Sequence, residues 1–191
     1  HMVTIVPRGG TGGHTQLLPS EESQFDTKEE MLQEITMALG GRAAEMLIFG
    51  DVTGGAVGDL QGATAQVRSM ITKLGMSDAI GPVYYGGGHE VFLGRDFAQE
   101  RDCSEKIAAA IDDEIRRVME ACLERAENLL RENMDKLHRL AEVLLDRETV
   151  VRDELDAIMK GEPLPERAKP AAPAQPQTPP APETADGTVV A

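Results

Sequence analysis

The stretch that decides the fold class is SEKIAAAIDDEIRRVMEACLERAENLLRE, residues 104–132. Apolar side chains recur along it every three or four positions, which places them on one face of an α-helix. They are Ile107, Ile111, Ile115, Val118, Cys122, Ala126 and Leu129. At a rise of 1.5 Å per residue, such a helix is roughly 40 Å long. Charged residues fill the remaining positions, and two interpretations stay open: a solvated face with ordinary ion pairs, or a contact between subunits.

Helical patterns continue downstream of this stretch. Apolar positions from Leu137 to Leu145 predict a second helix, and Asn133-Met134 is expected to interrupt the long pair. Leu155 and Ile158 predict a short last helix. The C-terminal part of the folded chain is therefore expected to be a long helix pair followed by one short helix.

Upstream, Thr27 and Glu30 have the spacing of a capping box, which predicts the beginning of a helix. Its expected apolar stripe ends before Gly40-Gly41 and consists of Met31, Ile35, Met37 and Leu39. A further helix is expected from Arg42 to Phe49, closed by Gly50. A third has Asp59 at its N-terminal end and is terminated by Gly75. Its apolar positions are Leu60, Ala63, Val67, Met70, Ile71 and Leu74.

The beginning of the chain has β rather than helical character. Val3 to Val6 is a short strand signal stopped by Pro7, and His14 to Leu18 could form a second strand after a glycine-rich turn. Aromatic residues make up only 3% of the chain and tryptophan is absent, so the core must be aliphatic. We expect a mainly α fold with a small N-terminal β ribbon and a long C-terminal helix pair.

Three segments differ in character. Residues 1–2, His-Met, are expected to be the remnant of a cleaved tag, so that the chain begins inside a larger protein. Residues 3–160 form the expected folded domain. Residues 161–191 contain eight of the 11 prolines and are expected to form an extended, disordered Pro/Ala-rich tail.

Composition excludes several classes of function. The formal net charge of −14 argues against nucleic acid as a partner, because phosphate binding requires a basic surface. No apolar run approaches the roughly 18 residues that a membrane span requires. The two cysteines, Cys103 and Cys122, cannot supply a disulfide framework or a four-ligand zinc site by themselves, and Cys122 is expected to be a small core residue.

The residues taken alone do not form a complete active site. A zinc peptidase helix carries two histidines one turn apart with a glutamate beside the first, so that both imidazoles reach one metal ion. His89-Glu90 begins this pattern, but position 93 is leucine. The lone histidines His14 and His138 favour surface or structural roles over metal ligation.

One ordered series of motifs carries more information. It comprises Val3-Thr4-Ile5-Val6-Pro7-Arg8-Gly9, Gly12-Gly13-His14-Thr15, Leu39-Gly40-Gly41-Arg42-Ala43-Ala44-Glu45, Phe49-Gly50-Asp51-Val52-Thr53, Asp59-Leu60-Gln61-Gly62-Ala63-Thr64, Gly75-Met76-Ser77, Gly81-Pro82 and Phe92-Leu93-Gly94-Arg95-Asp96. In order and spacing they resemble the peptidase domain of the FtsH family, over roughly residues 3–160. Members of that family are membrane-anchored, ATP-dependent zinc metalloproteases.

The resemblance implies roles for particular residues. Asp59 would be the third zinc ligand, with the other ligands on a His-Glu-x-x-His helix that lies upstream in the family and is missing here. From the residues alone, a helix N-cap is the favoured role for Asp59. The segment containing Gly12, Gly13, His14 and Thr15 would be the sheet edge on which the substrate chain lies. Glu45 and Arg42 are expected either to support the metal ligand without touching the metal, or to have structural roles.

Three departures from the family pattern stand out. His14 occupies a position where tyrosine is common, Met46 one that is usually acidic, and Gly58 one that is usually asparagine. The change to Gly58 leaves the hydrogen bonding before Asp59 in doubt. The implied possibility that His14 itself reaches zinc also stays open.

The resemblance further implies a parent protein with zinc and ATP as cofactors. That parent would be a homo-hexamer on the bacterial inner membrane, or an organelle equivalent, with this domain facing the cytoplasm. Its substrates would be unfolded or membrane polypeptides, and it would contact the membrane only through a missing N-terminal segment. The fragment itself is expected to be soluble and inactive, and not to retain zinc. The alternative is a non-catalytic helical scaffold or oligomerisation module.

Overall fold

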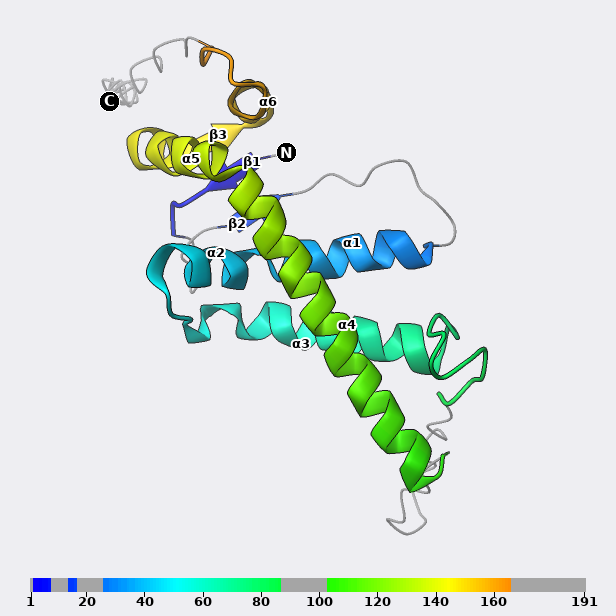
Figure 1. The fold of residues 1–191 in the computed structure, drawn as a ribbon. Coiled ribbons are helices and arrows are strands. Elements are labelled where there is room, and N and C mark those ends of the chain that lie inside the picture. The colour runs from blue at the N-terminus through cyan, green and yellow to red at the C-terminus, as the bar shows by residue number, and fades with distance from the viewer. Residues whose placement is uncertain (1, 8–13, 17–25, 87–102, 166–191) are drawn as a thin grey trace, which may run out of the picture.

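The computed structural model describes residues 2–7, 14–16, 26–86 and 103–165 of the chain (Figure 1). Its elements are β1 (Met2–Thr4), β2 (His14–Gln16), α1 (Lys28–Ala38), α2 (Gly40–Phe49), the 3₁₀ turn η1 (Gly54–Ala56), α3 (Val57–Thr72), α4 (Glu105–Glu132), α5 (Met134–Arg147), β3 (Thr149–Val151) and α6 (Arg152–Lys160). The expected mainly α fold with a small β element at its beginning is confirmed. Within these ranges, none of the helices has the length and apolar character needed to cross a membrane.

The long helix α4 crosses α1, α2 and α3 and holds them in one helical unit (Figure 1). The apolar faces of α1, α3 and α4 meet in the larger core cluster. Its buried members are Met31, Ile35, Leu39, Ala63, Val67, Met70, Ile71, Ile111, Ile115 and Cys122. Cys122 is therefore a core residue, as expected, and burial raises the pKa of its thiol. An aliphatic core of this size accounts for the scarcity of aromatic residues.

Helix α1 begins at the predicted capping box. The backbone N–H of Glu30 donates to Thr27 Oγ1 at 3.2 Å, and the backbone N–H of Thr27 donates to Glu30 Oε2 at 2.7 Å. The helix buries Met31 and Ile35, but Met37 is 57% exposed, so its place in the predicted stripe was wrong. Two positions beyond Ile35 correspond to a rotation of about 200°, which turns Met37 to the opposite face.

The next two helix boundaries differ slightly from those predicted. Helix α2 begins at Gly40 rather than at Arg42, directly after the C-cap of α1. It ends at Phe49 and is capped by Gly50, whose φ of 67° lies in the left-handed region. Helix α3 ends at Thr72, before the predicted Leu74, which is 50% exposed. Gly75 has a φ of 61° and lies close to Pro82, where an added Cβ would come within 3.1 Å of the proline Cα.

Helix α4 has Ser104 as its N-cap, whose hydroxyl accepts a 3.4 Å hydrogen bond from the backbone N–H of Ile107. Its stripe is buried at Ile111, Ile115, Cys122 and Ala126, whereas the predicted member Leu129 is 49% exposed. Asn133 separates α4 from α5, as expected. Beyond it, α5 turns away and packs mainly on β3 and α6 (Figure 1).

The sheet has one strand more than the predicted ribbon. The predicted strands β1 and β2 pair antiparallel, with Val3 opposite Thr15. The unpredicted strand β3 pairs antiparallel with the other side of β1, giving the order β2-β1-β3. A second, smaller cluster of buried side chains covers this region, with Val143 from α5, Val150 from β3 and Ile158 from α6.

The last helix ends at Lys160 and is capped by Gly161, which has a φ of 74°. The smaller cluster extends past this residue, because Leu164 packs against it. Residues 166–191 of the predicted tail lie outside the described part of the chain, as do 87–102, which contain His89-Glu90.

Candidate functional site

Asp59 lies in the first turn of α3, where it is exposed. It is the third residue of the helix, and Ala56 occupies the N-cap position, so the N-cap interpretation of Asp59 was wrong. Within the described residues, the Asp59 carboxylate accepts no hydrogen bond and forms no ion pair. A negative charge in the first turn is favoured by the helix dipole. The helix thus fixes the backbone of Asp59, while its exposed carboxylate has no partner within the described residues.

A carboxylate of this kind is a chemically suitable zinc ligand. It is not a metal site by itself: among the described residues, no group of three or more His, Cys, Asp and Glu side chains could hold a metal ion. The sequence also contains no His-Glu-x-x-His motif. Among the described residues, Asp59 is therefore a candidate ligand and not a metal site.

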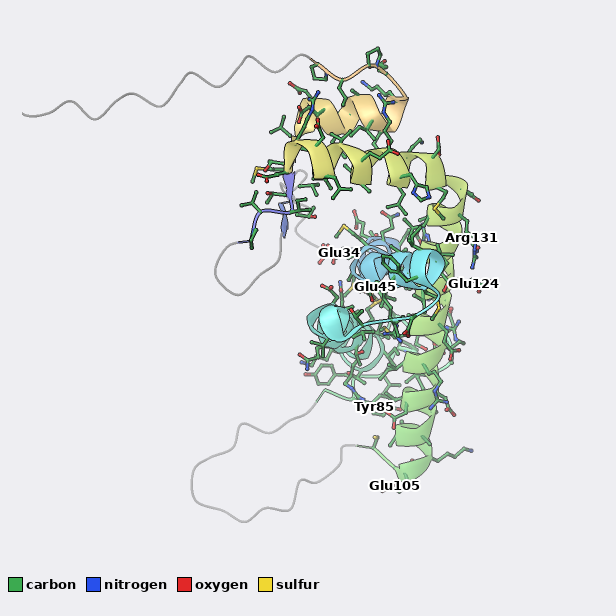
Figure 2. The ribbon with its side chains drawn as sticks, turned by 90° about the vertical axis from the view of Figure 1, so that its left-hand side faces the viewer. Glu34, Glu45, Tyr85, Glu105, Glu124 and Arg131 are labelled. Atoms are coloured by element: carbon green, nitrogen blue, oxygen red, sulfur yellow. The ribbon has the colours of Figure 1, made fainter. Side chains whose placement is uncertain are left out.

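Glu45, on α2, is joined to the turn that leads into α3. Its Oε2 accepts a 2.9 Å hydrogen bond from the backbone N–H of Thr53, and its Oε1 accepts a 2.7 Å hydrogen bond from the Thr53 hydroxyl. Figure 2 shows Glu45 on the side of α2 that faces the beginning of α3. These two bonds lower the pKa of Glu45, with a smaller contribution from the positive charge of Arg42 three residues earlier. The carboxylate is therefore ionised at neutral pH.

Gly58, at the position that is usually asparagine, is the second residue of α3, and a Cβ added there would meet nothing within 4 Å. The turn before α3 is hydrogen-bonded through Thr53 and Gly55 instead. The Gly55 backbone N–H donates to Thr53 Oγ1 at 3.2 Å, so the hydroxyl of Thr53 is used twice. A Cβ added at position 55 would lie 3.3 Å from the same oxygen. The turn before α3 is thus hydrogen-bonded through Thr53, and glycine at 55 leaves room for that oxygen.

Strand β2 lies at one edge of the sheet, since the order β2-β1-β3 places only β1 beside it among the described strands. Thr15 is exposed on it, opposite Val3 of β1. An edge strand presents backbone N–H and C=O groups that can pair with another extended chain. Gly12, Gly13 and the side chain of His14 lie outside the described residues, so the zinc-reaching possibility for His14 is untested.

The predicted site residues are connected only in part. Glu45 is joined to the α3 entrance through Thr53, whereas no hydrogen bond within the described residues links Asp59 to Thr15 or to Glu45. Sequence reasoning missed Thr53, which is the last residue of the Phe49–Thr53 motif but was assigned no role in the site. The available signal was a threonine directly before a Gly-Gly turn and a helix, since a hydroxyl there accepts backbone N–H bonds.

A groove of about 300 Å³ lies elsewhere on the helical unit. It opens between α1, α3 and α4, with Leu32, Val67 and Cys122 among its lining residues. Neither Asp59 nor the other described candidates line it. The concavity of the helical unit is therefore separate from the candidate ligand.

The sequence pattern described as Peptidase family M41 matches residues 1–158. The chain belongs to peptidase family M41. This M41 chain is 47% identical over 163 residues to "ATP-dependent zinc metalloprotease FtsH 1" of Thermoanaerobacter sp. (strain X514), covering 85% of the chain and 27% of that protein. It is also 47% identical over 169 residues to "ATP-dependent zinc metalloprotease FtsH" of Bacillus subtilis (strain 168), covering 87% and 26%.

A third relative, "ATP-dependent zinc metalloprotease FtsH 2" of Alkaliphilus metalliredigens (strain QYMF), is 48% identical over 163 residues, covering 85% of this M41 chain and 24% of that protein. The chain thus spans about a quarter of the length of these curated relatives. The resemblance seen in the ordered motifs is confirmed.

Proposed function

We propose that this chain is part of the peptidase domain of a membrane-anchored, ATP-dependent zinc metalloendopeptidase. Membership of peptidase family M41 and the names of the relatives support the reaction class. The observation that carries the proposal is the exposed carboxylate of Asp59, which lies in the first turn of α3 and has no partner within the described residues. Helix α3 fixes the backbone of Asp59, and the carboxylate oxygens are accessible to a group from outside the described residues.

In the proposed enzyme, Asp59 contributes one oxygen ligand to zinc, together with residues that this sequence does not contain. Bound zinc lowers the pKa of its water and polarises the scissile carbonyl. Glu45 and Arg42 support the region from α2, through the turn at Thr53. None of these residues needs to transfer a proton in this proposal.

Substrate binding is proposed for the edge strand β2 and the segment before it, which include Gly12, Gly13, His14 and Thr15. Main-chain pairing at a sheet edge satisfies the backbone groups of an extended polypeptide without selecting its side chains. This suits an enzyme whose substrates are unfolded or membrane proteins of many sequences.

The parent enzyme is proposed to be a homo-hexamer driven by ATP and anchored in the bacterial inner membrane, or an organelle equivalent, with this domain on the cytoplasmic side. The 191-residue chain alone is proposed to be inactive, because a single carboxylate cannot hold zinc tightly. The competing hypothesis is a helical scaffold or oligomerisation module without catalysis.

The test begins with the gene that encodes the chain, whose upstream codons should contain an in-frame His-Glu-x-x-His. The longer product should bind zinc and degrade casein in a chelator-sensitive reaction, and Asp59→Asn should abolish both. The matched control is Asp78→Asn, since Asp78 is fully exposed in the loop after α3, where it forms an ion pair with Lys28 at 3.4 Å. Full zinc content and activity in Asp59→Asn would contradict the ligand assignment. A start codon in place of the motif would favour the scaffold.

A further inference from the structure

The geometry points to Thr53 as a positioning residue for Asp59, acting through the hydrogen bonds that it shares with Glu45 and Gly55. We call these three residues the Glu45–Thr53 clamp. The inference rests on the proposed role of Asp59 as a metal ligand. It assigns to the turn between α2 and α3 the task of fixing where that ligand is presented.

The first half of the clamp joins Thr53 to α2. Thr53 donates twice to one carboxylate, through its backbone N–H to Oε2 of Glu45 at 2.9 Å and through its hydroxyl to Oε1 at 2.7 Å. A bidentate arrangement with a charged acceptor is stronger and more directional than a single neutral bond. It fixes both the backbone and the side chain of Thr53 relative to the end of α2.

The second half joins Thr53 to the beginning of α3. Its Oγ1 accepts the backbone N–H of Gly55 at 3.2 Å, which caps η1, and η1 continues directly into α3. The N-cap of α3, Ala56, has no side-chain acceptor of its own. Asp59 follows Gly55 by four residues, about one helical turn. The direction of the first turn, and with it the Asp59 carboxylate, therefore depends on Thr53.

The exposure of the clamp residues distinguishes a positioning role from a general contribution to stability. Thr53 is exposed, and Glu45 is only half-buried. Hydrogen bonds in contact with water contribute little to global stability, because water replaces them when they break. Removing the clamp should therefore leave the helical core folded while it loosens the turn and the first turn of α3.

The first test uses the 191-residue chain and amide hydrogen exchange at neutral pH. Thr53→Val removes the hydroxyl and keeps the shape of the side chain, and we expect at least a fivefold faster exchange confined to residues 53–60. Thr53→Ser keeps the hydroxyl and should return exchange to within twofold of the wild type. Protection in Thr53→Val equal to that of the wild type would overturn the inference.

The control for this test is Thr72→Val, at the other end of α3. Thr72 also loses a hydroxyl hydrogen bond, the one it donates to the backbone carbonyl of Arg68 at 2.8 Å. Thr72→Val should leave the amide exchange rates of residues 53–60 unchanged. If both valine variants accelerate exchange throughout the chain to the same degree, the Thr53 hydroxyl has only a general stabilising role, and the inference fails.

The second test uses the longer, zinc-loaded product of the same gene. Thr53→Val should release zinc to a chelator at least tenfold faster than the wild type, Thr53→Ser should behave like the wild type, and Thr72→Val should have no effect. Equal release rates in Thr53→Val and the wild type would overturn the inference while leaving the proposed function intact. A wild-type product that holds no zinc would instead defeat the proposed function, and the exchange result would still decide whether Thr53 fixes the first turn of α3.

Discussion

Ser77 donates a 2.8 Å hydrogen bond from its hydroxyl to the buried carboxylate of Glu114, which lies 37 positions later in the sequence. Glu114 is only 5% exposed, and Arg117 donates two further bonds of 2.7 Å to its two oxygens. The same Ser77 oxygen accepts the backbone N–H groups of Ala79 and Ile80. One carboxylate on α4 thus anchors the loop that follows α3.

The pH dependence of stability should reflect this carboxylate. The Arg117 hydrogen bonds lower the pKa of Glu114, against the opposing effect of burial. A group with a lowered folded-state pKa contributes its stabilisation above the unfolded value, about 4.3, and loses it as the pH falls through the folded value. The difference in unfolding free energy between the wild type and Glu114→Gln should therefore be full at pH 7 and shrink below about pH 4.5. Urea titrations from pH 7 to pH 3 measure it, and a difference independent of pH would contradict the assignment.

A second buried carboxylate, Glu154, is 1% exposed and accepts a 2.6 Å hydrogen bond from Nη1 of Arg147. Arg147→Met should cost about 3 kcal/mol, because it removes the Arg147 ion pair from a buried carboxylate. The double variant Arg147→Met with Glu154→Gln should cost less than Arg147→Met alone, since no charge is then left behind. Chemical denaturation of both variants decides the question, and a larger loss in the double variant would argue against the ion pair.

The two faces of α1 should respond differently to truncation. Ile35 is fully buried, so Ile35→Ala should cost about 2–5 kcal/mol through lost burial and a residual cavity. Met37 is 57% exposed, and Met37→Ala should change stability by less than about 0.5 kcal/mol. Thermal or urea unfolding measures both variants. An equal loss of unfolding free energy in Ile35→Ala and Met37→Ala would show that Met37 belongs to the buried apolar stripe after all.

Glu148 has a φ of 59°, the only positive φ of a non-glycine residue in the described ranges. It caps the C-terminal end of α5, a position where glycine is favoured because it has no Cβ. Glu148→Gly should raise the unfolding free energy by about 0.5–1 kcal/mol, and Glu148→Ala should not. Destabilisation by the glycine variant would show that the Glu148 side chain has a favourable role that outweighs the backbone strain.

The helices could be predicted because their signals are local. A capping box at Thr27 and a long apolar stripe from Ile107 identify α1 and α4 from neighbouring residues alone. Strand β3 could not be predicted, since three residues between two helical patterns are too few to show alternation, and its partner β1 lies at the other end of the chain. The burial of Leu129 was overestimated for a related reason. Helical spacing predicts which residues share one face of α4, but it does not show how far along the helix the neighbouring elements cover that face.

The candidate site was predictable to a different extent. Asp59 became a candidate zinc ligand only through the family resemblance, because the local sequence alone is also compatible with a helix N-cap at this position. Thr53 depends on a contact between the end of α2 and the beginning of α3, and such a contact exists only once both helices are placed. The apolar periodicity of the sequence does not predict this contact.

The sheet order β2-β1-β3 joins the two ends of the folded chain, because Thr4 pairs with Thr149. Closing a loop of that length carries a large entropic cost, whereas β1 and β2 are near neighbours in sequence and can pair early. During synthesis, the core cluster of α1, α3 and α4 is complete once α4 has left the ribosome, before β3 is available. The helical unit should therefore fold first, and the central strand should gain its second neighbour as the last step of the folding reaction.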